Sequence, residues 1–164
     1  MSLDTLENSL LDELNEVLAA ETQFSKVLRV VIRTGQSDEL KQDADDHLQE
    51  TLRHIDNLKK AFSALGARPE KGRLSRGAQG IVLEIEAKLR EGKPVGALRD
   101  LALISGNLRI EHYEIAAYTS AISMAKALGK RNILPLLQEN LKAEQTVLKK
   151  LDAAAVLILQ GKSW

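Results

Sequence analysis

The stretch that decides the fold is Leu108-Arg109-Ile110-Glu111-His112-Tyr113-Glu114-Ile115-Ala116-Ala117-Tyr118. The residues around it form an apolar stripe at helical spacing, which comprises Leu101, Ile104, Leu108, Ile115, Ile122 and Ala125. At about 100° per residue, Glu111 falls inside this stripe, within roughly 20° of Ile104 and Ile122. An ionised carboxylate in a buried seam is costly unless a positive group meets it. Arg109 projects to the opposite side of the helix, so the partner of Glu111 must come from elsewhere in the fold.

The composition predicts one all-α domain over residues 1–164. Aromatic residues make up only 3% of the chain, and helix-favouring Ala, Leu, Glu and Lys dominate. Lys and Arg together number 23, as do Asp and Glu, so the net charge is zero and a nucleic-acid partner is not expected. The basic residues Arg68, Lys71, Arg73 and Arg76 are interpreted as a solvated loop, with an anion-binding patch as the alternative.

The sequence also limits the environment of the protein. It has no cysteine, which excludes disulfides and thiolate metal sites. The longest apolar run, residues 153–159, is too short to span a bilayer, and the acidic, amphipathic N-terminus does not resemble a secretory signal. We therefore expect a soluble, cytoplasmic protein with no membrane partner.

Helical periodicity and Gly and Pro stops predict four long helices and a short one. The long helices are expected over 3–33, 39–65, 95–128 and 132–159, and the short helix over 76–90. The apolar stripe of the first helix begins at Leu3 and Leu6. The second and third long helices are separated by about 30 residues, which lets both start at the same end. This pattern predicts a ferritin-like four-helix bundle with one long crossover connection that carries a short fifth helix.

Each long helix places an acid on or beside its apolar stripe, near the middle of the helix. Glu21 lies on the stripe of the first helix, and Glu144 lies on that of the last. Glu114 is at the edge of the Glu111 stripe, one turn further along. Antiparallel packing would bring these carboxylates to a similar depth in the bundle.

The second long helix contributes two imidazoles as well as an acid. His47 and His54 are seven residues apart and nearly superimposed on the apolar stripe, with Glu50 between them at its edge. Tyr118 is close enough to its own stripe to donate a hydrogen bond to a carboxylate. Taken singly, each inward acid can reach water at the seam and each inward His can be an ordinary core residue. Taken together, they would repel strongly unless cations neutralised them. An oxygen-rich site with one or two imidazoles suits iron or manganese better than zinc.

Several of these segments resemble a known bacterial family. Residues 111–118 look like "EHYEIAxY", the signature of the YciE/YciF family of ferritin-like stress-response proteins. Residues 47–51, 20–23 and 100–104 are similar to its "HLEET", "AEKQL" and "DAALI" segments, and residues 137–144 follow its last helix. The resemblance implies a ferritin-like bundle, often dimeric, with two Fe or Mn ions. The metal ligands that it implies are Glu21, Glu50, Glu111 and Glu144, with His54 or His47 and Glu114 as further ligands.

The chain also departs from the general ferritin-like pattern, which has Glu-x-x-His on two helices. Glu50 is followed by Arg53 and Glu144 by Val147, so neither pair is present. The leading hypothesis is a homodimeric protein with a dinuclear Fe/Mn site that oxidises Fe(II) or reduces O2 or peroxide. In this hypothesis Glu50 and Glu111 bridge the ions, Glu21 and Glu144 are terminal ligands, and a histidine of the second long helix completes the shell. No catalytic side chain is assigned. The alternative is a non-enzymatic helical scaffold whose acid cluster is degenerate and metal-free, and a ferritin-type storage shell is a third reading.

Overall fold

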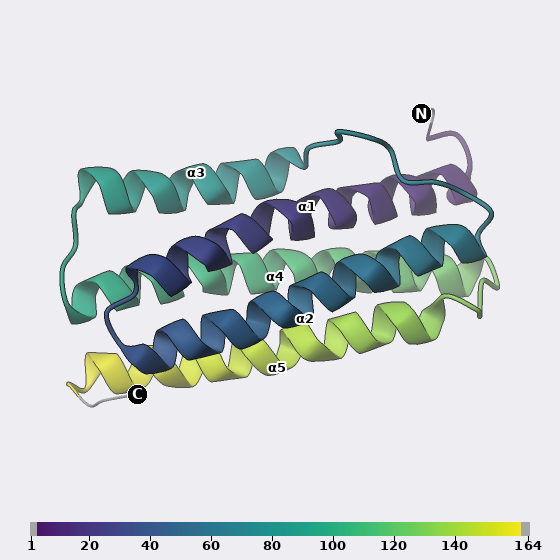
Figure 1. The fold of residues 1–164 in the computed structure, drawn as a ribbon. Helices are drawn as coiled ribbons and strands as arrows, with labels where there is room; N and C mark the ends of the chain where they lie inside the picture. Colours follow the sequence, from purple (N-terminus) through teal and green to yellow (C-terminus); the bar gives the residue numbers. More distant parts are fainter. Residues whose placement is uncertain (1–2, 162–164) are drawn as a thin grey trace.

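The fold is an all-helical bundle with one crossover, as predicted (Figure 1). A computed structural model describes residues 3–161. Its helices are α1 (Leu6–Thr34), α2 (Asp38–Ala64), α3 (Arg76–Glu91), α4 (Ala97–Ala127) and α5 (Leu134–Leu159). Helices α1, α2, α4 and α5 form the bundle, and α3 packs on the outside against α1 and α4. Helices α2 and α4 begin at the same end of the bundle, which the long connection between them permits.

Side-chain caps set three of the helix starts. The hydroxyl oxygens of Thr5, Ser37 and Ser75 accept hydrogen bonds from the third backbone N–H of α1, α2 and α3, at 3.1, 3.3 and 3.2 Å. The predicted inward positions of Leu3 and Leu6 are wrong, because their side chains are 59% and 41% exposed. Leu3 precedes the Thr5 cap, so helical periodicity does not apply to it, and Leu6 lies in the first turn at the end of the bundle.

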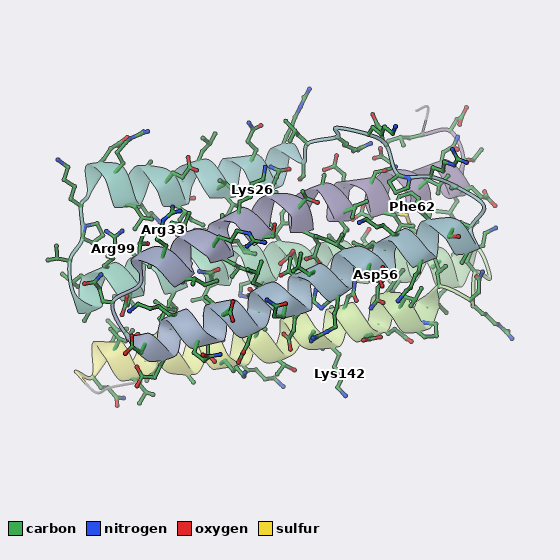
Figure 2. The ribbon with its side chains drawn as sticks, viewed as in Figure 1. Lys26, Arg33, Asp56, Phe62, Arg99 and Lys142 are labelled. Atoms are coloured by element: carbon green, nitrogen blue, oxygen red, sulfur yellow. The ribbon has the colours of Figure 1, made fainter. Side chains whose placement is uncertain are left out.

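A buried carboxylate fastens the tight turn between α1 and α2 to the start of α4. The two Asp100 carboxylate oxygens accept hydrogen bonds from the backbone N–H groups of Gln36 and Ser37, at 2.7 and 2.8 Å. Arg99 donates to the Thr34 carbonyl oxygen at 2.8 Å, and its side chain lies beside this turn in Figure 2. These bonds satisfy N–H groups at the start of α2 that a helix cannot pair internally.

The crossover is held against α1 by polar contacts at the start of α3. Gln23 accepts from the Ser75 N–H at 2.8 Å and donates to the Ser75 carbonyl at 3.2 Å. Arg73 forms ion pairs with Asp12 and Glu16 at 2.8 and 2.6 Å. The interpretation of this basic segment as a solvated loop is therefore wrong for Arg73, whose charge is satisfied by α1.

The bundle core has a polar layer between two apolar layers, one on each side of it. One layer contains Phe24, Val31, Leu48 and Leu151 with their neighbours, and the other contains Leu14, Leu58, Phe62 and Leu137 with theirs. Between them, all four long helices bury acids or histidines. This arrangement places apolar side chains between the polar layer and each end of the bundle.

The stripe predicted for α4 is partly wrong. Leu108 and Ile115 are only half-buried, whereas Glu114, expected at an edge, is 2% exposed. The reason is that α4 packs against α1, α3 and α5, so more than one face of this helix is covered. A single stripe therefore describes α4 poorly.

The charged surface of the bundle points outward. Figure 2 shows Lys142 extending away from α5, and Asp56 lies on the outer face of α2, where it pairs with Lys60. Within residues 3–161, no helix combines the length and the apolar character that crossing a membrane requires.

Candidate metal centre

The polar layer gathers six of the seven side chains predicted as ligands. Its members are Glu21 from α1, His47 and His54 from α2, Glu111 and Glu114 from α4, and Glu144 from α5. All six are at most 5% exposed. They form two groups in which one ligand atom per residue lies within 4.8 Å of every other, and Glu144 belongs to both groups.

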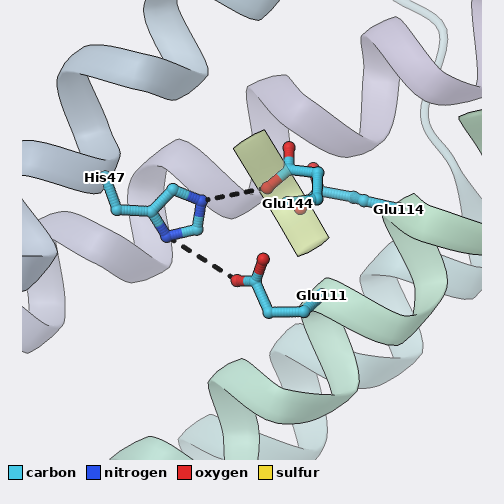
Figure 3. A group of neighbouring side chains, drawn as sticks. All are labelled: His47, Glu111, Glu114 and Glu144. Carbon is cyan, nitrogen blue, oxygen red and sulfur yellow. Dashed lines mark ion pairs between the residues drawn. The ribbon is translucent and has the colours of Figure 1, made fainter. Parts of the chain in front are cut away.

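The first group consists of His47, Glu111, Glu114 and Glu144 (Figure 3). The two ring nitrogens of His47 face different carboxylates: Nδ1 is 3.6 Å from Glu111 Oε1, and Nε2 is 3.4 Å from Glu144 Oε2. These separations are too long for good hydrogen bonds. The imidazole thus stands between two carboxylates without bonding tightly to either.

The second group consists of Glu21, His54 and Glu144. His54 Nδ1 lies 2.8 Å from Glu144 Oε1 and 3.3 Å from Glu21 Oε1. The Tyr118 hydroxyl donates a hydrogen bond to Glu21 Oε1, as the sequence predicts for this tyrosine. Glu21 therefore keeps one oxygen bound to Tyr118, and its other oxygen has no partner among the described residues.

Two asparagines that the sequence analysis missed support this second group. Asn140 donates to the Tyr118 hydroxyl oxygen at 2.9 Å and to the His54 carbonyl at 3.3 Å, and its side-chain oxygen accepts from Asn57 at 2.8 Å. Asn140 precedes Glu144 by four residues, so the two share a helix face, and this spacing is the signal that could have identified it. A search restricted to titratable residues passes over such amides.

Unpaired polar atoms are concentrated in this layer. Among residues 3–161, the buried side-chain oxygens and nitrogens without a hydrogen-bond partner include both carboxylate oxygens of Glu111 and of Glu144, Glu21 Oε2, Glu114 Oε1, His47 Nε2 and His54 Nδ1. Of these, His54 Nδ1 and Glu144 Oε1 meet as an ion pair at 2.8 Å without the geometry of a hydrogen bond. Buried polar groups in folded proteins are almost always bonded, and each unpaired one costs about 1–3 kcal/mol. Lone pairs left open on carboxylates and imidazoles are what a divalent cation takes up. The residues present therefore fit a metal.

Burial raises the proton affinity of the two acids on α4. Loss of solvation, reinforced by the nearby Glu144 carboxylate, holds the pKa of Glu111 well above its ordinary value. Burial and the charges of Glu21 and Glu144 do the same to the pKa of Glu114. Without a cation, these acids are driven toward their protonated forms.

His54 and Glu144 form the charged pair of the layer. Burial alone would lower the pKa of His54, but the Glu144 and Glu21 carboxylates outweigh it and raise this pKa to about 10. Burial would raise the pKa of Glu144, but His47 and His54 outweigh it and lower this pKa to about 2. Opposite charges therefore already compensate each other in this pair.

Glu50, the seventh predicted ligand, lies outside both groups. Its side chain is 34% exposed, and its Oε1 atom is 3.6 Å from Arg53 Nη2. Glu50 is nevertheless near enough for its charge to contribute to the raised pKa of Glu111. This position at the rim of the layer gives no support to the bridging role expected of Glu50, and Glu144 is the carboxylate shared by the two groups.

The fold and this interior define the class of protein: a ferritin-like helix bundle with a carboxylate and histidine cluster in its core. The chain belongs to the DUF892 family, described as a domain of unknown function, whose sequence model matches residues 5–162. It is 28% identical to Protein YciF of Escherichia coli K12 over 156 residues, which cover 95% of this chain and 93% of that protein. The resemblance to the YciE/YciF family is therefore confirmed.

Solved structures agree with this assignment. The crystal structure of the E. coli stress protein YciF matches with a TM-score of 0.91 and 27% identity, covering 98% of this chain and all of that one. YcfI from Rhodopseudomonas palustris matches with a TM-score of 0.86 and 32% identity, covering 93% and 97%. A ferritin-like, diiron-carboxylate protein from Bacillus anthracis matches with a TM-score of 0.71 at 19% identity, over 94% and 99% of the two chains. This last likeness concerns the fold alone.

Proposed function

We propose that this protein binds two divalent Fe or Mn ions in the polar layer of its bundle and acts in the response to stress. The observation that carries the proposal is the pair of buried ligand groups that share Glu144, with unpaired oxygens and nitrogens in both. Glu111, Glu114 and His47 would hold one ion, Glu21 and His54 the other, and Glu144 both. Because most ligands in this site are carboxylate oxygens, the site favours iron or manganese. The link to stress comes from the relative YciF, which is described as a stress protein.

The redox chemistry of such a centre would come from the metal: bound Fe(II) or Mn(II) would supply electrons to dioxygen or peroxide. The chain supplies the environment. Apolar layers on both sides exclude bulk water, and the Tyr118 hydroxyl orients Glu21. The raised pKa values of Glu111 and Glu114 mean that these acids release protons when a cation binds.

Metal analysis tests the proposal. Purified protein is treated with chelator, loaded without oxygen with Fe(II) or Mn(II), desalted and analysed for bound metal. We expect two ions per wild-type chain and none in Glu21→Ala/Glu144→Ala. The matched control, Glu7→Ala/Glu139→Ala, removes one exposed glutamate from each of the same two helices and should still bind two ions. In parallel samples that are given Fe(II) and not desalted, exposure to air should oxidise the iron faster with wild type than with the double-alanine variant.

Circular dichroism must show that each variant is folded, and Glu21→Gln/Glu144→Gln offers a milder change of the same charges. If wild type retains no more metal than the folded Glu21/Glu144 double variants, the proposal is wrong.

A metal-free helical scaffold is the second candidate, and one observation favours it. The 2.8 Å approach of His54 to Glu144 gives the layer an internal charge pair, and protons on Glu111 and Glu114 would remove most of the remaining repulsion. For this scaffold, the unfolding midpoint should respond to pH but be unchanged by Fe(II), Mn(II) or chelator. The homodimer expected from the family resemblance also remains a prediction, which analytical ultracentrifugation tests.

A further inference from the structure

A cavity of about 40 Å³ lies beside the polar layer and is lined by residues of α1, α2, α4 and α5. One water molecule needs roughly 10–15 Å³ of such space, so the cavity has room for a small number of waters or a partly hydrated ion. His47, a member of the first ligand group, lines the cavity. The cavity therefore reaches the layer itself.

Asn107 lines this cavity with a buried side chain. Its side chain is 3% exposed, and its Nδ2 group donates to the Leu103 carbonyl at 2.9 Å. A carbonyl accepts only from a donor, so the orientation of the Asn107 amide is determined and Oδ1 points away from Leu103. Within residues 3–161, Asn107 Oδ1 is buried without a partner. This oxygen is an acceptor of the kind that a hydrated or partly hydrated cation uses.

The position of Asn107 along α4 connects the cavity to the ligands. Asn107 precedes Glu111 by four residues, which places it on the same helix face at about 6 Å along the axis. Helix α2 has the same kind of spacing, with Asp43 four residues before His47. Oxygen and nitrogen ligands thus follow one another at intervals of one turn from the cavity into the layer.

The outer part of the cavity carries negative charge. Asp43, Asp46 and Glu50 of α2 line it, and Lys150 of α5 opposes them with one positive charge. Asp43 is half-buried and Asp46 is exposed, so these residues form the mouth. Three carboxylates around one narrow opening raise the local concentration of cations.

We propose that this cavity is the route by which a divalent cation enters the core: Asp43, Asp46 and Glu50 attract the hydrated ion, and Asn107 Oδ1 binds it on its way to His47 and Glu111. This inference rests on the proposed function, because a route needs a site to lead to. Asn107 and the carboxylates at the mouth therefore affect the rate at which the ion is taken up, and they do not change the final number of bound ions.

The test measures the rate of Mn(II) uptake by chelator-treated full-length protein, with a fluorescent divalent-cation indicator in a stopped-flow instrument at low ionic strength. We expect Asp43→Asn/Asp46→Asn to take up Mn(II) about tenfold more slowly, with the same final content per chain. The matched control, Asp45→Asn/Asp56→Asn, removes two carboxylates of α2 that do not line the cavity and should keep the wild-type rate. Asn107→Leu should also slow uptake, and Lys150→Gln should accelerate it.

The outcomes separate the route from the site. Equal uptake rates in the mouth variant and its control, with full Mn(II) content in both, would overturn the route and leave the proposed function intact. A mouth variant with fewer bound ions would also overturn it, because Asp43 and Asp46 would then be ligands. Wild-type protein that takes up no Mn(II) would overturn the proposed function itself, and the route with it.

Discussion

His54 Nδ1 and Glu144 Oε1, on α2 and α5, are 2.8 Å apart in the centre of the bundle. The two residues come from helices that the sequence separates by about 90 positions, and the carboxylate also belongs to the His47 group. Glu144 is therefore the residue on which both ligand groups depend.

Replacement of Glu144 by glutamine should reduce both stability and metal binding. The change leaves the His54 charge without its nearest counter-ion, and removal of one partner from a buried pair costs about 3 kcal/mol. Urea unfolding of the chelator-treated protein at pH 7 measures this loss. Glu139→Gln, on the exposed face of the same helix, should change stability by less than about 0.5 kcal/mol. A Glu144→Gln protein that is as stable as wild type and still binds two ions would show that Glu144 is not the shared ligand.

The metal-free protein should lose stability as the pH rises from 5 to 9. The pKa of His54 is raised to about 10, so its stabilising contribution is complete below about pH 6.5 and declines as the pH approaches 10. Glu111 and Glu114, with pKa values raised above 4.5, also favour the folded state only while they are protonated. Glu144 acts in the opposite sense, and its contribution is lost only below pH 4.5, as the pH falls toward 2.

Bound metal should reverse this slope, because a cation needs deprotonated ligands and binds more tightly as the pH rises. Urea unfolding at several pH values, with chelator or with Mn(II) under nitrogen, measures both slopes. Glu111→Gln/Glu114→Gln should flatten the slope of the metal-free protein. Parallel slopes with and without Mn(II) would contradict the assignment of these acids as ligands.

Gly106 and Gly80 should respond oppositely to alanine. A Cβ atom at Gly106 would lie 2.6 Å from Ile85 Cγ1, where α3 packs on α4, whereas a Cβ at Gly80 meets nothing within 4 Å. Overpacking destabilises a folded protein by about 1–3 kcal/mol, whereas the higher helix propensity of alanine stabilises the helix by up to about 1 kcal/mol relative to glycine. Gly106→Ala should therefore destabilise the protein by about 1–2 kcal/mol and Gly80→Ala should stabilise it slightly. Ile85→Ala in the Gly106→Ala background should cost less than the sum of the two changes, and exact additivity would mean that the two residues do not clash.

Asp100→Asn should destabilise the protein by about 2 kcal/mol. In the wild type, each carboxylate oxygen of Asp100 accepts a hydrogen bond from a backbone N–H. In the variant, the amide nitrogen would face one of these N–H groups and could not accept its hydrogen bond. Thermal unfolding against Asp152→Asn, an exposed acid of α5, measures the difference. Equal midpoints in the two variants would show that the turn between α1 and α2 does not depend on Asp100.

Much of the fold could be predicted because glycine stops and apolar spacing act locally. Gly66, Gly92 and Gly129 follow the ends of their helices, and the crossover length determines which helices are parallel. The predictions for α4 were less accurate, since a stripe on one helix cannot reveal that three neighbours cover it. That is why Glu114 was expected at an edge and is buried.

The cluster could be predicted in outline for a similar reason. An inward acid is visible in one helix, so Glu21, Glu111 and Glu144 could be identified one at a time. The separation of Glu50 from the ligand groups depends on how α2 turns relative to α4 and α5, which helical periodicity does not describe. The amides of Asn140 and Asn57 were missed because their importance comes from the partners they meet across the bundle.

Anomalous diffraction is the most direct test of whether the polar layer binds two Fe or Mn ions. Crystals are grown from chelator-treated protein, soaked in Fe(II) or Mn(II) without oxygen, and measured at the iron and manganese absorption edges. We predict two anomalous peaks in the bundle core, one among His47, Glu111 and Glu144 and the other among Glu21, His54 and Glu144. A fully soaked crystal with no anomalous peak at these carboxylates would contradict it.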